Sequence, residues 1–195
     1  MKIILRLFFI FFSFLSFAQI NDSNVNLLIN KISQTEAKGD TTSNDYANLI
    51  NNLAIYYTNK GMYTQAEPLF IKVSTIRKSV YGENHLSYAT SLNNLAFLYQ
   101  KQGRYIEAEP VLLKSLQIEK SILGSDNSDY LDSYEMLGFL YENLNKYDYA
   151  LKVFNEYITK NSTKDQVMYD NEYGKFSISY DVQFNKLQRF YDPKL

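Results

Sequence analysis

Few residues of this chain have the chemistry of a catalytic or metal site. The sequence holds one histidine, His85, and no cysteine. Catalytic triads need a histidine beside a nucleophile, and zinc sites need several histidine or cysteine ligands. The glycines are isolated from one another, so the sequence has no Gly-rich phosphate-binding loop. We therefore expect no enzyme activity, no bound metal and no cofactor.

Tyrosines and carboxylates are plentiful, but their positions favour structural roles. Tyr57, Tyr99 and Tyr141 recur at a constant spacing among apolar residues, which is typical of packing positions. Carboxylates such as Glu107 and Glu109 fall at solvated or helix-capping positions. The net charge of -1 and the lack of a Lys or Arg stripe argue against a nucleic-acid partner.

The chain repeats itself with a period of 42 residues. Several residue types keep the same position in three successive copies, and the first copy holds them at Tyr46, Leu53, Tyr57, Tyr63 and Ala66. A fixed period of this length indicates stacked supersecondary units that bury a shared core between neighbours. The expected function is therefore a binding surface.

Each unit carries the signals of two helices. Apolar residues follow steps of three, one and three along the first, as on one face of a helix. The first helix should start at the position that holds Ser43, His85 or Asn127, where Ser and Asn are strong N-caps. We expect helix pairs near residues 45–81, 87–123 and 129–161.

Three further positions of the repeat define where the first helix ends and how each pair packs. The first helix should end where a residue tolerates positive φ: Gly61, Gly103 and Asn145. Small residues on both helices should let the pair approach closely: Ala54, Ala96 and Gly138 on the first, and Ala66, Ala108 and Ala150 on the second.

These residues resemble the tetratricopeptide repeat. The second copy shows its hallmarks as Leu95-Ala96, Tyr99, Ala108 and Leu112. The usual period is 34, and the longer period together with the run LNNLAFLYQKQGRYIEAEP resembles the 42-residue subclass of kinesin light chains and many bacterial scaffold proteins. The resemblance implies an all-α fold, a right-handed α-solenoid of tetratricopeptide helix hairpins.

The first residues have the pattern of an export signal. Lys2 and Arg6 give a basic start, an apolar run follows, and Ser16 and Ala18 are small residues at the positions that signal peptidase reads. We expect residues 1–18 to be a cleaved signal peptide and the mature protein to be exported to the periplasm or the extracellular space. The alternative is an uncleaved membrane anchor.

The remaining chain divides into three segments. Residues 19–45 should contain an N-terminal capping helix, because a terminal repeat otherwise exposes its apolar face. Residues 46–161 hold the three 42-residue repeats. Residues 162–195 leave the register, and their apolar spacing fits a strand or a helix. We favour a helix packed on the last repeat, since a lone strand would have no partner.

The resemblance also implies a binding face. In the family the first helices line a concave groove, and in kinesin light chains the Asn pair of LNNLA contacts extended peptides. The matching residues here are Asn51, Asn52, Asn93 and Asn94. The alternative is that these amides bind neighbouring repeats instead of a peptide.

Spacing places further residues on the same face. The groove floor should carry Ile55, Phe97 and Phe139, and the third repeat has Glu135 at the Asn position among other acidic residues. We expect a protein–protein interaction scaffold that binds a peptide or protein segment in this groove, with no membrane span after signal cleavage. The alternative function is the sensory or docking portion of a protease or signalling assembly whose catalytic domain is absent from this chain.

Overall fold

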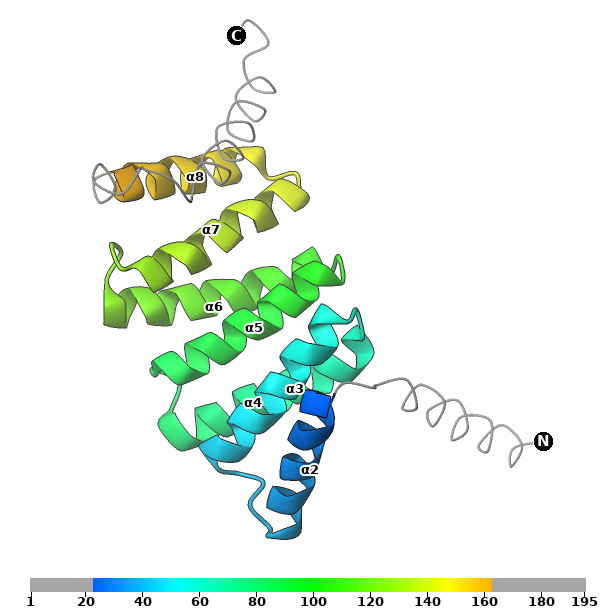
Figure 1. The fold of residues 1–195 in the computed structure, drawn as a ribbon. Coiled ribbons are helices and arrows are strands. Elements are labelled where there is room, and N and C mark those ends of the chain that lie inside the picture. Colours follow the sequence, from blue (N-terminus) through cyan, green and yellow to red (C-terminus); the bar gives the residue numbers. More distant parts are fainter. Residues whose placement is uncertain (1–22, 163–195) are drawn as a thin grey trace, which may run out of the picture. The chain divides into compact units, whose positions relative to one another are not determined.

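The computed structural model describes residues 23–162, which form seven α-helices (Figure 1). The helices are α2 (Ser23–Ala37), α3 (Asn44–Asn59), α4 (Tyr63–Tyr81), α5 (Leu86–Lys101), α6 (Tyr105–Leu123), α7 (Ser128–Asn143) and α8 (Tyr147–Ser162). The three predicted helix pairs and the all-α fold class of tetratricopeptide hairpins are confirmed. The predicted signal peptide and residues 163–195 lie outside the described residues.

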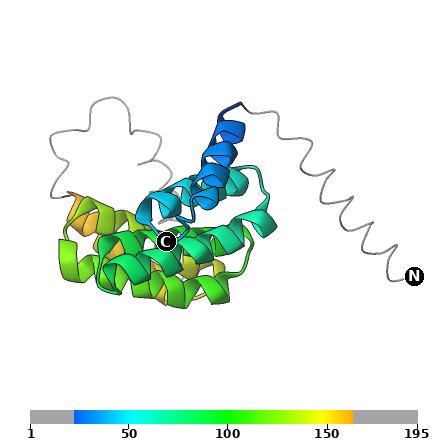
Figure 2. The same ribbon diagram turned by 90° about the horizontal axis from the view of Figure 1, so that it is seen from below.

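The chain divides into two compact units with a boundary after Val80, near the end of α4. Unit 1 contains α2, α3 and α4, and unit 2 contains α5 to α8. Within unit 2 the four helices follow one another as two hairpins, and they largely overlie one another when viewed along the stack (Figure 2). In unit 1, α2 joins α3 through Glu36, which accepts a hydrogen bond of 2.6 Å from the Tyr46 hydroxyl.

The first helix of each repeat begins at the predicted N-cap. The side chains of Ser43, His85 and Asn127 each accept a hydrogen bond from a backbone N–H two or three residues later, at 3.1, 3.1 and 2.8 Å. The His85 ring also stacks on Tyr81 with 4.4 Å between the ring centroids. The single histidine is therefore used as a helix cap.

The first helices also end as predicted. Gly61, Gly103 and Asn145 have φ values of 72°, 73° and 57°. In each case the next N–H bonds back to the carbonyl of the tyrosine four residues before the turn residue, at 2.8 Å. This is the Schellman arrangement, and it satisfies carbonyls that the end of a helix would otherwise leave unpaired.

The core of unit 2 forms around the small residues of the repeat. Ala96 and Ala108 are fully buried and belong to one apolar cluster. The other buried members of that cluster are Leu112, Leu116, Tyr130, Leu131, Leu137, Leu140 and Val153. The cluster draws on all four helices of the unit, so the two hairpins share a core.

The third repeat packs more tightly at one of these positions. A methyl group on Gly138 would lie 2.6 Å from Cε1 of Phe154, far inside van der Waals contact. The second repeat holds Ala96 and Leu112 at the same two positions. The smallest residue of α7 therefore faces a larger side chain from α8.

We predict that Gly138→Ala destabilises the protein, although alanine is the better helix former by about 1 kcal/mol. The added methyl must displace the buried Phe154 ring, and overpacking of a core costs about 1–3 kcal/mol. The double variant Gly138→Ala/Phe154→Leu recreates the Ala96–Leu112 pair and should recover stability. Urea unfolding is the measurement, and a single variant at least as stable as the parent would contradict the packing argument.

Candidate functional site

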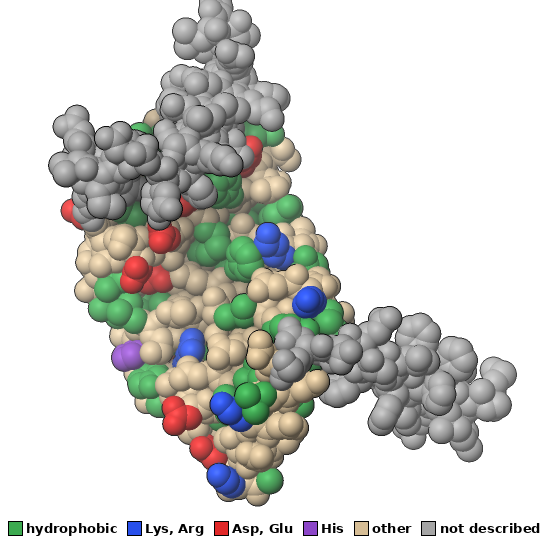
Figure 3. Space-filling model, in the orientation of Figure 1, with side chains coloured by type: hydrophobic (Ala, Val, Ile, Leu, Met, Phe, Trp, Pro, Cys, Tyr) green, Lys and Arg blue, Asp and Glu red, His purple; other side chains and the backbone are tan. Residues whose placement is uncertain are grey.

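The candidate site is the face of unit 2 formed by the first helices, α5 and α7. Asn93, Phe97 and Lys101 follow one another at steps of four along α5, so they share one side of that helix. Glu135 and Phe139 occupy the matching positions on α7. Figure 3 shows acidic side chains over the first half of α7 and basic side chains toward the opposite end of the same face, with apolar groups between them.

Asn93 does not lie free on this face. Its Nδ2 group donates to Oε1 of Glu119 on α6 at 2.6 Å and to Oγ of Ser133 on α7 at 2.7 Å. Both amide hydrogens are therefore used inside the array, and one amide joins three helices of two repeats. The predicted exposure of Asn93 is wrong, and its contacts are those of the alternative in which these amides bind neighbouring repeats.

Asn51 differs from the prediction in the same way. It is only 9% exposed. Thr58, about two turns further along α3, is also buried. The physical reason is that a first helix packs on more than one neighbour, so its buried arc is wider than its apolar column. An asparagine at the edge of that arc is polar and lies outside the apolar column, so its spacing in the sequence predicts an exposed position.

The other predicted residues differ among themselves in exposure. Asn52 and Ile55 on α3 are exposed, and Asn94 is half-buried. Phe97 on α5 is 41% exposed, and Lys101 lies over its ring with Nζ 5.0 Å from the centroid. A partner-binding role for these residues stays a prediction.

Phe139 belongs to the core more than to an open groove floor. Its ring packs edge-on against Phe154 at a centroid distance of 5.2 Å and an interplanar angle of 67°. The side chain is half-buried and packs on the cluster of Ala150 and Phe154. The predicted apolar floor is therefore formed in unit 2 chiefly by Phe97.

The acidic end of the face holds two carboxyl groups with raised pKa values. Burial raises the pKa of Glu135 to about 7, and the nearby charge of Asp132 adds to the rise, whereas a hydrogen bond with Tyr157 acts against it. Burial and then the charge of Asp129 raise the pKa of Asp132. In the described part of the chain, the groups that act on the pKa of either carboxyl include no cation.

The basic end of the face is tied to the second helices. Arg104 lies over the Tyr99 ring at 4.4 Å and forms a 2.6 Å ion pair with Glu107. Lys146, in the turn between α7 and α8, reaches back 2.7 Å to Glu109 on α6. Sequence reasoning missed this contact between repeats, because Glu109 and Lys146 are 37 residues apart in the chain.

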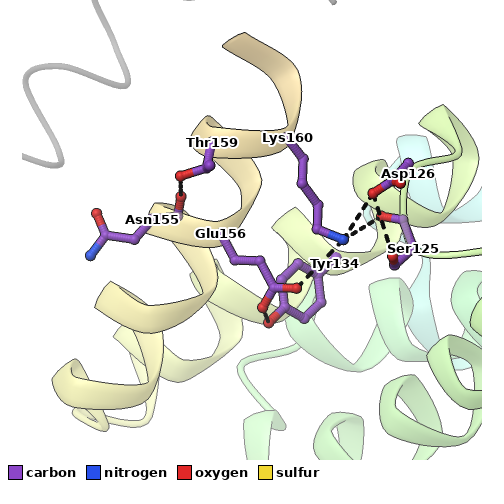
Figure 4. Close-up of polar contacts among 7 residues, drawn as sticks. All are labelled: Ser125, Asp126, Tyr134, Asn155, Glu156, Thr159 and Lys160. Atoms are coloured by element: carbon purple, nitrogen blue, oxygen red, sulfur yellow. Dashed lines mark hydrogen bonds and ion pairs between the residues drawn. The ribbon is translucent and has the colours of Figure 1, made fainter. Parts of the chain in front are cut away.

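A second polar cluster, also missed from the sequence, fixes α8 to the unit (Figure 4). Lys160 Nζ lies 3.0 Å from both the Ser125 carbonyl oxygen and Asp126 Oδ1, in the turn between α6 and α7. The Tyr134 hydroxyl donates to Glu156 on α8 at 2.8 Å. These contacts anchor the last described helix to α7 and to the turn before it.

The described part of the chain offers little for catalysis or metal binding. Residues 23–162 contain no group of three His, Cys, Asp or Glu side chains placed to hold a metal ion. Within the same residues, no helix combines the length and the apolar character that crossing a membrane requires.

Comparison with known proteins decides the family. The model of the tetratricopeptide repeat family matches residues 45–99 and 87–159. The chain belongs to the tetratricopeptide repeat family. Such domains generally act as protein–protein interaction modules, so protein partners are indicated. No curated protein sequence matches the chain.

Solved structures agree on the fold. One is a Podosopora anserina protein described as a kinesin light chain with nearly identical TPR-like repeats, at 18% identity and a TM-score of 0.65, covering 75% of this chain and 67% of that chain. Another is BtubC from P. vanneervenii, at 16% identity and a TM-score of 0.65, covering 85% of this chain and 72% of that chain. At such identities the likeness concerns the fold alone.

We predict that Asn93→Ala destabilises unit 2. The change leaves Glu119 Oε1 and Ser133 Oγ without the donor they share, and such a loss costs about 1–3 kcal/mol for a buried polar group. Asn52→Ala, at an exposed position, is the control and should change stability by no more than about 0.5 kcal/mol. Equal melting temperatures for the two variants would remove Asn93 from the structural role.

Proposed function

We propose that this chain is a protein–protein interaction scaffold that holds a segment of a partner protein or peptide across α5 and α7. The observation that carries the proposal is Phe97, a large aromatic side chain that is 41% exposed on the face of first helices. Aromatic residues are enriched at partner-binding surfaces because they bury a large area at little entropic cost. Membership of the tetratricopeptide family supports this use of the face.

The charges around Phe97 define the chemistry of the partner. Partial desolvation and neighbouring carboxyl groups hold the pKa values of Glu135 and Asp132 on α7 above their ordinary values. A Lys or Arg side chain brought beside them favours their ionised forms and is attracted in return. The segment that fits best therefore combines an apolar side chain, which packs on Phe97, with a basic one that lies opposite α7.

The amides take a smaller part in this proposal than the sequence indicated. Both hydrogens of the Asn93 amide are already used on Glu119 and Ser133. Asn52 and Ile55 are exposed on α3 in unit 1, where Asn52 offers an amide and Ile55 an apolar side chain. Recognition then rests on side-chain complementarity at α5 and α7.

We predict that peptides selected on this protein from a random display library are enriched in an apolar residue near Lys or Arg. Phe97→Ala should weaken the selected peptides about tenfold or more, the size of effect typical of a buried aromatic anchor. Leu113→Ala on α6 is the matched control, since Leu113 is also 41% exposed, and it should leave binding unchanged. The readout is peptide affinity by fluorescence anisotropy.

The same assay tests whether the acidic residues of α7 cause the preference for Lys and Arg. The double variant Asp132→Asn/Glu135→Gln should lose the preference for Lys and Arg while keeping the apolar contact. If Phe97→Ala and Leu113→Ala bind the selected peptides equally well, the α5–α7 face is not the binding surface. If the preference for basic residues survives the double variant, the acidic part of the proposal is wrong.

We also propose that the scaffold is exported by a bacterial cell and acts in the periplasm or the extracellular space. The basic, apolar and small-residue pattern of residues 1–18 supports this location. Protein recovered from the exported fraction of an expressing bacterium should begin at Gln19. N-terminal sequencing is the measurement, and a chain that begins at Met1 would show that the segment is retained.

A further inference from the structure

Glu119 is a buried carboxyl group in the seam between the second and third repeats. It lies on α6 and is 5% exposed. Asn93 on α5 and Ser133 on α7 both form hydrogen bonds with it. A carboxyl in such a place must be well paired or neutral, because burial of an uncompensated charge is very costly.

The hydrogen bonds around Glu119 involve the Asn93 amide and the hydroxyl groups of Ser133 and Ser115. Asn93 Nδ2 gives its hydrogens to Glu119 Oε1 and Ser133 Oγ. The Ser133 hydroxyl donates to the Asp129 carbonyl oxygen at 3.2 Å. The Ser115 hydroxyl donates to the Ala89 carbonyl oxygen at 2.7 Å. Each serine hydroxyl has one hydrogen, which it can give either to its carbonyl oxygen or to Glu119, and Glu119 Oε2 has no partner among the described residues in this arrangement.

Two acceptor atoms remain without a donor in the described residues. They are Asn93 Oδ1 and Glu119 Oε2, and both are inaccessible to solvent. An ionised carboxylate can only accept, so ionised Glu119 leaves both atoms unsatisfied. A protonated carboxyl has an O–H, so a proton on Oε2 turns an unsatisfied buried acceptor into a donor for a neighbouring acceptor.

The same conclusion holds for either orientation of the amide. If the oxygen and nitrogen of Asn93 exchange places, the amide oxygen lies 2.6 Å from Glu119 Oε1. Two oxygens at that separation need a hydrogen between them. The hydrogen can come only from the carboxyl group, because amide oxygens carry none.

We propose that Glu119 carries a proton in the folded protein, and that the pair of its carboxyl with the Asn93 amide is a pH-sensitive junction between the second and third repeats. Loss of the proton puts a charge in the seam and leaves two buried acceptors unpaired. The contact of α6 with α5 and α7 is then weakened. Rising pH therefore loosens this seam.

The electrostatic surroundings act in the same direction. Burial raises the pKa of Glu119 above its ordinary value; hydrogen bonds with Ser133, Asn93 and Ser115 act against the rise, and the charge of Asp129 on α7 adds to it. Tyr130 on α7 is coupled to the same group, and its own pKa is raised by burial and by the charges of Glu156 and Glu119. Among the described residues, the charged side chain that acts on Glu119 is thus another acid.

The sign of the pH dependence follows from this direction. A carboxyl whose pKa is raised on folding binds its proton more tightly in the folded state. Its contribution to stability is complete below the pKa of the unfolded chain and is lost as pH rises through the pKa of the folded chain. The opposite holds for the exposed Glu107 on the same helix, whose pKa is lowered by its hydrogen bond with Arg104.

The test compares Glu119→Gln with the parent protein, full-length in its mature form, by urea unfolding across acidic to neutral pH. Glutamine keeps the shape, accepts from Asn93 and donates permanently. The urea midpoint of the parent should match that of the variant at acidic pH and fall below it as pH rises. Glu107→Gln is the matched control on α6, and there the parent should gain on its variant as pH rises.

A second measurement keeps the proposal testable if Glu119→Gln folds poorly. Carbon-13 NMR of the side-chain carboxyl reports the protonation of Glu119 directly in the unmodified sequence. Its titration midpoint should lie above that of the same residue in the urea-unfolded chain. A midpoint at or below the unfolded value, or a difference between parent and Glu119→Gln that does not change with pH, would overturn the proposal and leave a bound water as the donor.

Discussion

The structure depends on the close approach of paired helices at their small residues. Ala96 on α5 and Ala108 on α6 are fully buried, and the apolar cluster of unit 2 forms around them. A larger residue on either helix would separate the backbones and open the cluster, since protein cores are packed at near-crystalline density. The tyrosines, leucines and caps of each repeat only position these contacts. The sequence repeats every 42 residues because each helix pair needs small residues at the same point of contact.

That constraint explains why the fold was readable from the sequence. Helix ends need residues that tolerate positive φ, and Gly61, Gly103 and Asn145 all adopt it. Helix starts need a side-chain acceptor, and Ser43 and Asn127 supply one. Such requirements are local, so suitable residue types recur at the same position of every copy. Their agreement across three copies predicted the helix pairs to within one residue at most boundaries.

The candidate site was less readable because exposure is not a local property. Asn51 and Asn93 lie beside the apolar column of their helices, and one is buried while the other bridges Glu119 and Ser133. A period gives the spacing of positions along each helix, but the width of the buried arc depends on how many neighbours the helix touches. The prediction that Phe97 lies on the exposed side of α5 is correct. Phe97 is one turn beyond Asn93, which contacts Glu119 and Ser133.

The polar residues of the seams also make the repeats unequal. At the position of Glu119 the first repeat has Arg77, which is buried and donates to Asn48 Oδ1 at 2.9 Å. A donor and an acid cannot replace one another there: an acid would face the Asn48 acceptor, and a guanidinium would face the Asn93 donor. The apolar positions are therefore shared by the repeats, whereas the buried polar positions differ and pair with partners particular to each repeat.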